Sequence, residues 1–173
     1  MKTMINRKPI KAIFIFTCCI LISLQAKAQV SETSELFLKL KTNDSLLFNV
    51  GFNACDVSQF KKLIAEDFEF YHDVAGITES KIDFIKSITD GLCGTSNPTK
   101  SRRKLVAKSL EVFPLYKNGA LYGAIQKGEH EFFESVHGEP ESKGSIAKFS
   151  HVWIKEEHGW KIRRVLSYDH KMQ

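Results

Sequence analysis

The chain has 173 residues, of which 25 are Lys or Arg and 20 are Asp or Glu, and its sequence pI is about 9.0. Five of the basic residues and none of the acidic ones fall within the first 28 positions, so the remainder carries 20 of each and no net charge. The basic pI is therefore a property of the N-terminal segment. It gives no reason to expect a nucleic-acid-binding protein.

The N-terminal segment has the three parts of a secretory signal peptide. Met1 to Lys11 is basic, Ala12 to Leu24 is an uncharged apolar run, and Ala26-Lys27-Ala28 fits a cleavage site. The apolar run is too short to span a bilayer, which needs about 20 residues. We therefore divide the chain into a signal peptide (1–28), a short lead (29–35) and one domain (36–173). We expect an exported, periplasmic or secreted protein with no membrane attachment after cleavage.

Two cysteines, Cys55 and Cys93, remain after that cleavage. An oxidising compartment permits a disulfide between them, but both lie near ends of predicted helices and nothing in the sequence brings them together. We favour two free, buried thiols that add little to stability. There is no CxxC pair and no Cys/His spacing typical of zinc, and we expect neither a metal nor a cofactor.

Hydrophobic periodicity predicts helices first and strands last. A long helix over Leu36–Ala54 precedes a second helix, which starts at a capping-box pattern formed by Asp56 and Gln59. The later elements are a strand (67–74), a third helix capped by Thr78 and ended by Gly91, a loop (91–101), strands 104–116 and 121–134, and two closing strands within 149–170. Asn118-Gly119 is a hairpin turn signal.

This order implies an α+β domain, with the N-terminal helices packed on one face of a curved antiparallel sheet around a cone-shaped core. The basic run of Lys100, Arg102, Arg103 and Lys104 is interpreted as the solvated entry to a strand, since the domain has no net charge.

The last two strands carry an unusual mixture of side chains on the face that alternation points inward. Phe149, His151 and Trp153 share one face of the first strand. Leu166, Tyr168 and His170 share a face of the second with Arg164. Imidazole, indole and phenol beside Phe and Leu indicate the wall of a partly apolar pocket.

Three stretches resemble one known family. They are FEFYHDVAGITESKIDFI (68–85), GEHEF (128–132) and the ending FSHVWIKEEHGWKIRRVLSYDH (149–170). They resemble the nuclear transport factor 2-like superfamily, and within it the SnoaL-like domains of unknown function that bacteria export. The resemblance implies a cone-shaped (cystatin-like) fold, a homodimer, and a pocket between sheet and helices. Because members include both enzymes and binding domains, it implies no single activity.

Several residues are candidates for chemistry in this pocket. His72, on the same strand face as Phe70, is a candidate general base, because a desolvated imidazole stays neutral at pH 7. In a regular hairpin His130 lies opposite His151, close enough to share a proton or, with His72 as third ligand, a metal.

On the last strand, Tyr168 could donate to an oxyanion and His170 could act beside it. Arg164 could bind a carboxylate, although a salt bridge at the rim is the simpler interpretation. We therefore list His72, His151, Tyr168 and His170 as candidate catalytic residues. The candidate pocket residues are Phe70, His130, Phe149, Trp153 and Arg164.

The function that these observations favour is an exported domain that binds a small, partly apolar molecule. The alternative is a cofactor-independent isomerase, dehydratase or cyclase that uses a pocket histidine as general base. A third class, an interaction module that dimerises through the sheet, fits less well because the polar groups converge on one inward face.

Export gives the first testable prediction. Protein recovered from the native secretory fraction should begin at Gln29, because cleavage follows Ala28. Intact-mass measurement checks this, and a retained Met1 or an acyl group on Cys19 would contradict it.

Overall fold

The computed structural model describes residues 29–173 of the chain, so the predicted signal peptide lies outside the described residues. None of the helices described is long and apolar enough to cross a bilayer. The helical segments are α2 (Glu35–Ser45), the π-helical η1 (Leu46–Phe52), α3 (Ser58–Leu63), α4 (Lys81–Lys86) and the π-helical η2 (Ser87–Leu92).

The helix starts follow from local side-chain caps. Ser34 caps α2 by accepting a hydrogen bond from the backbone N–H of Phe37, and α2 then continues directly into η1, as the predicted long helix requires. Asp56 accepts from the backbone of Ser58 and from the side chain of Gln59. The cap of α4 is Ser80, so the prediction of Thr78 was wrong.

The described residues form seven strands, which agree only in part with the strands predicted from the sequence. They are β1 (Ile64–His72), β2 (Gly76–Thr78), β3 (Thr99–Leu105), β4 (Glu111–Lys117), β5 (Ala120–Val136), β6 (Ser142–Glu156) and β7 (Gly159–Met172). The single strand expected over 104–116 is two strands, separated by a turn in which Lys108 takes a positive φ of 63°. The predicted Asn118-Gly119 turn joins β4 to β5, with both residues at positive φ.

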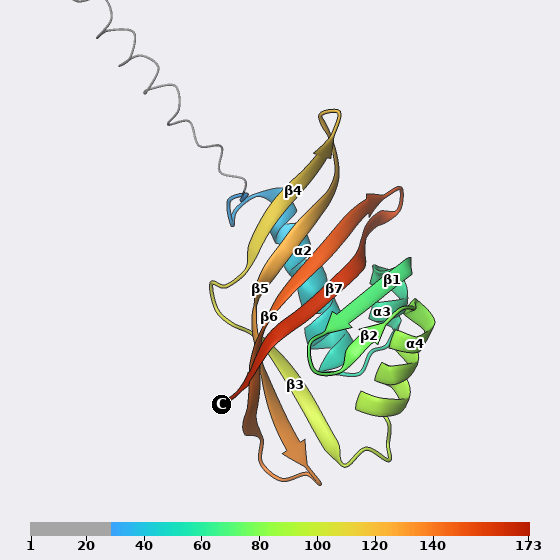
Figure 1. The fold of residues 1–173 in the computed structure, drawn as a ribbon, viewed down its shortest axis with the longest axis vertical. Coiled ribbons are helices and arrows are strands. Elements are labelled where there is room, and N and C mark those ends of the chain that lie inside the picture. The colour runs from blue at the N-terminus through green and yellow to red at the C-terminus, as the bar shows by residue number, and fades with distance from the viewer. Residues whose placement is uncertain (1–28) are drawn as a thin grey trace, which may run out of the picture.

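The strands form one sheet in the order β2-β1-β7-β6-β5-β3, with β4 also pairing with β5 (Figure 1). The sheet is mixed and not purely antiparallel as predicted, because β1 runs parallel to β7. Parallel strands cannot be joined by a tight hairpin turn. Here the connection between β1 and β7 is long, because strands β2 to β6 all lie between them in the sequence.

The helices cover one face of this curved sheet, and α2 crosses behind β5, β6 and β7 in the view of Figure 1. The core lies between the two layers, which confirms the α+β architecture. Its fully buried members come from both layers: Leu40 and Leu47 from the helices, and Phe68, Phe149 and Trp153 from the sheet.

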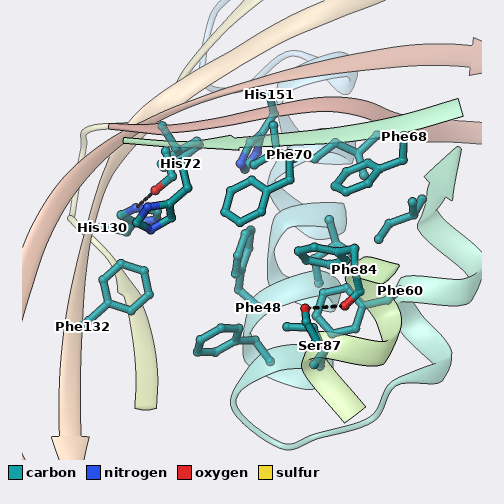
Figure 2. A pocket seen from close by; sticks show the side chains of 18 residues that line it. Phe48, Phe60, Phe68, Phe70, His72, Phe84, Ser87, His130, Phe132 and His151 are labelled. Carbon is teal, nitrogen blue, oxygen red and sulfur yellow. Dashed lines mark hydrogen bonds between the residues drawn. The ribbon is translucent and has the colours of Figure 1, made fainter. Parts of the chain in front are cut away.

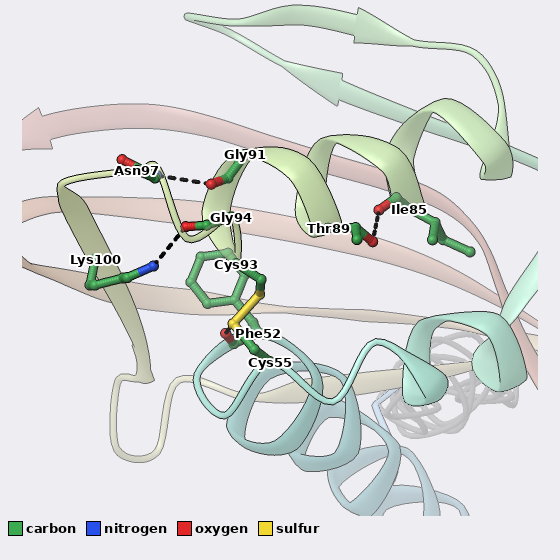
Figure 3. The surroundings of a disulfide bond; sticks show 9 residues. All are labelled: Phe52, Cys55, Ile85, Thr89, Gly91, Cys93, Gly94, Asn97 and Lys100. Carbon is green, nitrogen blue, oxygen red and sulfur yellow. Dashed lines mark hydrogen bonds between the residues drawn. A yellow bond between two sulfur atoms is a disulfide. The ribbon is translucent and has the colours of Figure 1, made fainter.

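Cys55 and Cys93 form a disulfide (Figure 3). Cys55 follows η1 and Cys93 follows η2, so the bond links the ends of two helical segments. The two cysteines are 38 positions apart in the sequence. The prediction of two free thiols was therefore wrong. Periodicity places each helix on the sheet but carries no information about which helix ends meet.

The disulfide should contribute substantially to stability. Closing a loop of 38 residues restricts the unfolded chain and stabilises the fold by about 4 kcal/mol in the chain-entropy model. A reductant should therefore lower the melting temperature by roughly 10 °C. Thermal unfolding with and without reductant tests this, and a Cys55→Ser/Cys93→Ser variant should show no response. Coincident wild-type melts would contradict the expectation.

Candidate functional site: a phenylalanine-lined cavity with a polar wall

A cavity of about 270 Å³ lies between the concave face of the sheet and the helices (Figure 2). Eight of its lining residues are phenylalanines, which come from both layers: Phe48, Phe52, Phe60, Phe68, Phe70, Phe84, Phe132 and Phe149. The polar side chains in the lining are His72, Ser87, His130, His151 and Ser167. The site is thus an apolar chamber with a few placed polar groups, as is typical of small-molecule pockets.

His151 is fully buried and presents one nitrogen without a partner. Gln126 fixes the ring: its amide N–H donates to the carbonyl of Leu40, so its oxygen faces His151 and also accepts from the indole of Trp153. His151 therefore carries its proton on Nδ1, 3.3 Å from that oxygen. Among the described residues Nε2 has no hydrogen-bond partner.

The His151 ring is held by stacking and kept neutral by its surroundings. It lies against Phe149 and Phe48, with ring centroids 4.4 and 5.8 Å away. Burial, followed by the nearby charge of Arg103, lowers the pKa of His151 well below its ordinary value. The unpartnered lone pair on Nε2 is therefore a buried hydrogen-bond acceptor in the residue that forms this part of the cavity wall.

A buried ion pair supports this wall. The Arg103 guanidinium contacts both carboxylate oxygens of Asp44, at 2.8 and 3.1 Å. It lies over the ring of Phe48 at 4.0 Å and near that of Phe149. Burial raises the pKa of the Asp44 carboxyl, and Arg103 opposes this by favouring the charged form.

His130 is oriented by the same arginine. Nε of Arg103 donates to Nδ1 of His130 at 3.3 Å, so the neutral ring carries its proton on Nε2, which lies 3.4 Å from Oγ of Ser167. Burial, followed by the charge of Arg103, lowers the pKa of His130 to about 3.

A second cluster lies where β1 ends beside β7. Nδ1 of His170 lies 2.5 Å from a carboxylate oxygen of Asp73, and Nε2 lies 3.4 Å from Oγ of Ser167. The rings of His72 and His170 stack with centroids 4.2 Å apart. Nδ1 of His72 accepts hydrogen bonds from the backbone N–H groups of Val74 and Ala75. Burial, followed by His170, lowers the pKa of His72.

Atoms of His72, Asp73 and His170 lie within 4.8 Å of one another, close enough to hold a metal ion. However, Nδ1 of His72 already accepts two backbone hydrogen bonds, and Nδ1 of His170 faces the Asp73 carboxylate. These hydrogen bonds already use Nδ1 of both imidazole rings.

The predicted pairing of His130 with His151 was wrong. The cross-strand partner of His151 is Gln126, and that of His130 is Ala147. This register differs from the regular hairpin by an even number of positions, so both imidazoles still face the interior. Both rings pack on Phe149, with centroids 5.2 Å away for His130 and 4.4 Å away for His151.

Arg164 and Tyr168 do not line the cavity, because β7 is irregular, and the interpretation of Arg164 as a salt-bridge residue at the rim is confirmed. A register shift between Ile162 and Arg164 leaves an extra residue and reverses the alternation. Arg164 consequently forms an ion pair with Glu69, and Tyr168 lies on the outer face with its hydroxyl near Ser150. Trp153 is buried behind the cavity wall, where it supports Gln126.

The same irregularity brings in a residue that sequence reasoning missed. Strict alternation puts Ser167 and His170 on opposite sides of the strand, but Asp169 takes a positive φ of 61° at a second register shift, and both side chains face inward. The sequence analysis also missed Asp44. Its helical spacing from Leu40 and Leu47 puts it on the buried face of the helix, and a carboxylate on that face is a signal for a buried charge.

Comparisons with known proteins identify the fold. A nuclear transport factor 2-like superfamily protein from Salmonella enterica superposes with a TM-score of 0.58 at 17% identity, over 78% of this chain and 92% of its own. ActVI-ORFA from Streptomyces coelicolor gives 0.62 at 11% identity, over 80% and 98%. A nuclear transport factor 2-like protein from Cytophaga hutchinsonii gives 0.57 at 14%, over 78% and 98%.

No protein-family model matches the chain, and no curated protein is significantly similar to it in sequence. The fold is that of the nuclear transport factor 2-like, or cystatin-like, proteins, and the expected resemblance to them and to SnoaL-like domains is confirmed at the level of the fold.

The buried histidines predict a specific pH dependence of stability. Folded His130 has a pKa of about 3, whereas the ordinary value of 6.5 applies to the unfolded chain. Below pH 6.5 the unfolded state therefore binds a proton that the folded state excludes. The free energy of unfolding should therefore decrease as the pH is lowered. Well below pH 6.5, this residue should contribute a decrease of about 1.4 kcal/mol for each pH unit.

Urea unfolding between pH 7.5 and 5 measures this slope, and His151 should add to it in the same direction. In a His151→Phe variant, which keeps the stacked ring, that added part should disappear. Stability that is constant over this range would show that neither ring is held neutral.

Proposed function

We propose that this domain binds a small, mainly apolar molecule that carries a hydroxyl or similar hydrogen-bond donor. The molecule occupies the cavity between sheet and helices, and its donor meets Nε2 of His151. The observation that carries the proposal is this nitrogen, which is buried without a hydrogen-bond partner among the described residues and belongs to a ring that lines the cavity.

A buried acceptor without a partner costs the fold about 1–3 kcal/mol, which a bound donor would recover. The phenylalanine lining favours an aromatic or aliphatic body for the ligand. Charged ligands are disfavoured, because Asp44 already neutralises Arg103 and both lie behind the wall. The volume is near the lower end for ligand pockets, which supports a compact molecule of one or two rings.

The competing function was an isomerase, dehydratase or cyclase with a pocket histidine as general base. A general base is most effective when its pKa is near the working pH. Burial and Arg103 lower the pKa of both His130 and His151 far below that range, so these rings accept hydrogen bonds but hold protons weakly. This supports binding over proton abstraction at these two residues.

Export to the periplasm or medium and assembly into a homodimer remain part of the proposal. Export is supported by the pattern of residues 1–28, and dimerisation is supported by the fold resemblance alone.

A matched pair of ligands tests the role of His151. We expect the protein to bind 2-naphthol about tenfold more tightly than naphthalene, because only the former donates to Nε2. In His151→Phe this difference should disappear while naphthalene still binds, since the ring stack persists and Gln126 keeps its bond from Trp153. Fluorescence or calorimetric titration measures both.

His158→Ala, at an exposed turn, serves as the control variant. Equal affinity of the wild type for the two ligands would overturn the assigned role of His151. Failure of both ligands to bind would overturn the cavity as the site.

A further inference from the structure

A continuous row of polar contacts follows one wall of the cavity. Nε of Arg103 contacts Nδ1 of His130 at 3.3 Å, and Nε2 of His130 contacts Oγ of Ser167 at 3.4 Å. The same Oγ lies 3.4 Å from Nε2 of His170, whose Nδ1 lies 2.5 Å from Asp73. Figure 2 shows His130, a member of this row, among the residues that line the cavity. Neither Ser167 nor His170 is needed for the binding role proposed above.

The direction of every hydrogen bond in the row follows from what each group can donate. A guanidinium only donates, so Nδ1 of His130 accepts and its Nε2–H donates to Ser167. At the other end an ionised carboxylate only accepts, so Nδ1–H of His170 donates to Asp73 and leaves a lone pair on Nε2. The hydroxyl proton of Ser167 therefore points to Nε2 of His170.

The charge of Asp73 is also favoured by its surroundings. Burial raises the pKa of this carboxyl, but hydrogen bonds from the backbone and ring of His170 outweigh burial and lower it overall. Asp73 is thus suited to hold the His170 ring in one tautomer.

A hydroxyl bonded to an imidazole, which is in turn oriented by a carboxylate, is the arrangement that activates a serine nucleophile. We propose that Ser167, His170 and Asp73 act in this way and cleave an ester of a small apolar acid or alcohol bound in the cavity. The inference rests on the proposed function in one respect, namely that the cavity admits such a molecule.

The reaction is balanced with water as the only co-reactant. Oγ of Ser167 forms a bond to the ester carbonyl carbon while its proton passes to Nε2 of His170. The carbon–oxygen bond to the alcohol then breaks, and the alcohol leaves with that proton. Water adds to the acyl group on Ser167 and gives a proton to His170, which returns it to Oγ as the carboxylic acid departs.

The geometry provides access and a donor for the carbonyl oxygen. Ser167 and His72 line both the cavity and a shallow depression on the neighbouring surface, so they lie between the two. His72 accepts backbone hydrogen bonds at Nδ1, so its neutral ring carries a proton on Nε2. This N–H can stabilise the oxyanion that forms when the serine attacks.

An active-site-directed fluorophosphonate and the ester p-nitrophenyl butyrate test the proposal on the purified protein. We expect one adduct by intact mass, mapped to Ser167 by peptide analysis, together with ester hydrolysis. Ser167→Ala should lose both. Asp73→Asn should slow labelling and hydrolysis by roughly 10³-fold or more, because the carboxylate no longer fixes the tautomer.

Ser150→Ala is the matched control, because Ser150 lies on the adjacent strand with its hydroxyl near Tyr168 on the outer face. It should label and hydrolyse as the wild type does. If Ser167→Ala does not fold, the mapped adduct on the wild type and the effect of Asp73→Asn still decide the question.

An adduct at another residue, or none while 2-naphthol binds normally, would overturn the nucleophile and leave the binding function standing. Hydrolysis that survives in Ser167→Ala but is lost with EDTA would replace it by a metal held at His72, Asp73 and His170. Absence of adduct, hydrolysis and 2-naphthol binding together would overturn both proposals.

Discussion

The buried pair of Arg103 and Asp44 is the interaction on which the cavity wall depends. It joins β3 to α2 across 59 positions in sequence and is enclosed by aromatic rings. Two charges in such an environment are tolerated only together, since removing one partner of a buried pair costs roughly 3–5 kcal/mol. The pair therefore holds helix and sheet at a fixed separation, and the cavity occupies the space beside it.

The pair also sets the chemical state of groups in the cavity wall. Because the arginine can only donate, it fixes the tautomer of His130, which in turn fixes the role of Ser167. Burial, followed by the charge of Arg103, lowers the pKa of His130 and of His151. The ion pair thus determines which atoms of His130 and Ser167 donate and which accept, whereas Gln126 does so for His151.

The sequence was sufficient for the fold because the fold depends on local signals. Hydrophobic periodicity located the helices, the Asn118-Gly119 turn located a hairpin, and alternation correctly turned His130, Phe149 and His151 inward. The sequence was insufficient wherever a residue departs from its local pattern. Arg164 and Tyr168 face outward because one extra residue in β7 reverses the alternation. Ser167 and His170 share a side for the same kind of reason, and no periodic pattern encodes it.

Long-range pairing was equally inaccessible. The partner of Arg103 and the bond between Cys55 and Cys93 depend on how helices dock on the sheet. The disulfide also has a consequence for how a ligand could enter and leave the cavity. The segments η1 and η2 contribute Phe48, Phe52 and Ile88 to the lining. Because the disulfide links these two segments covalently, they cover the cavity as one unit. These segments cannot part independently, so we expect a molecule to enter where His72 and Ser167 line both the cavity and the surface depression. On that route it passes Ser167 before it reaches His151.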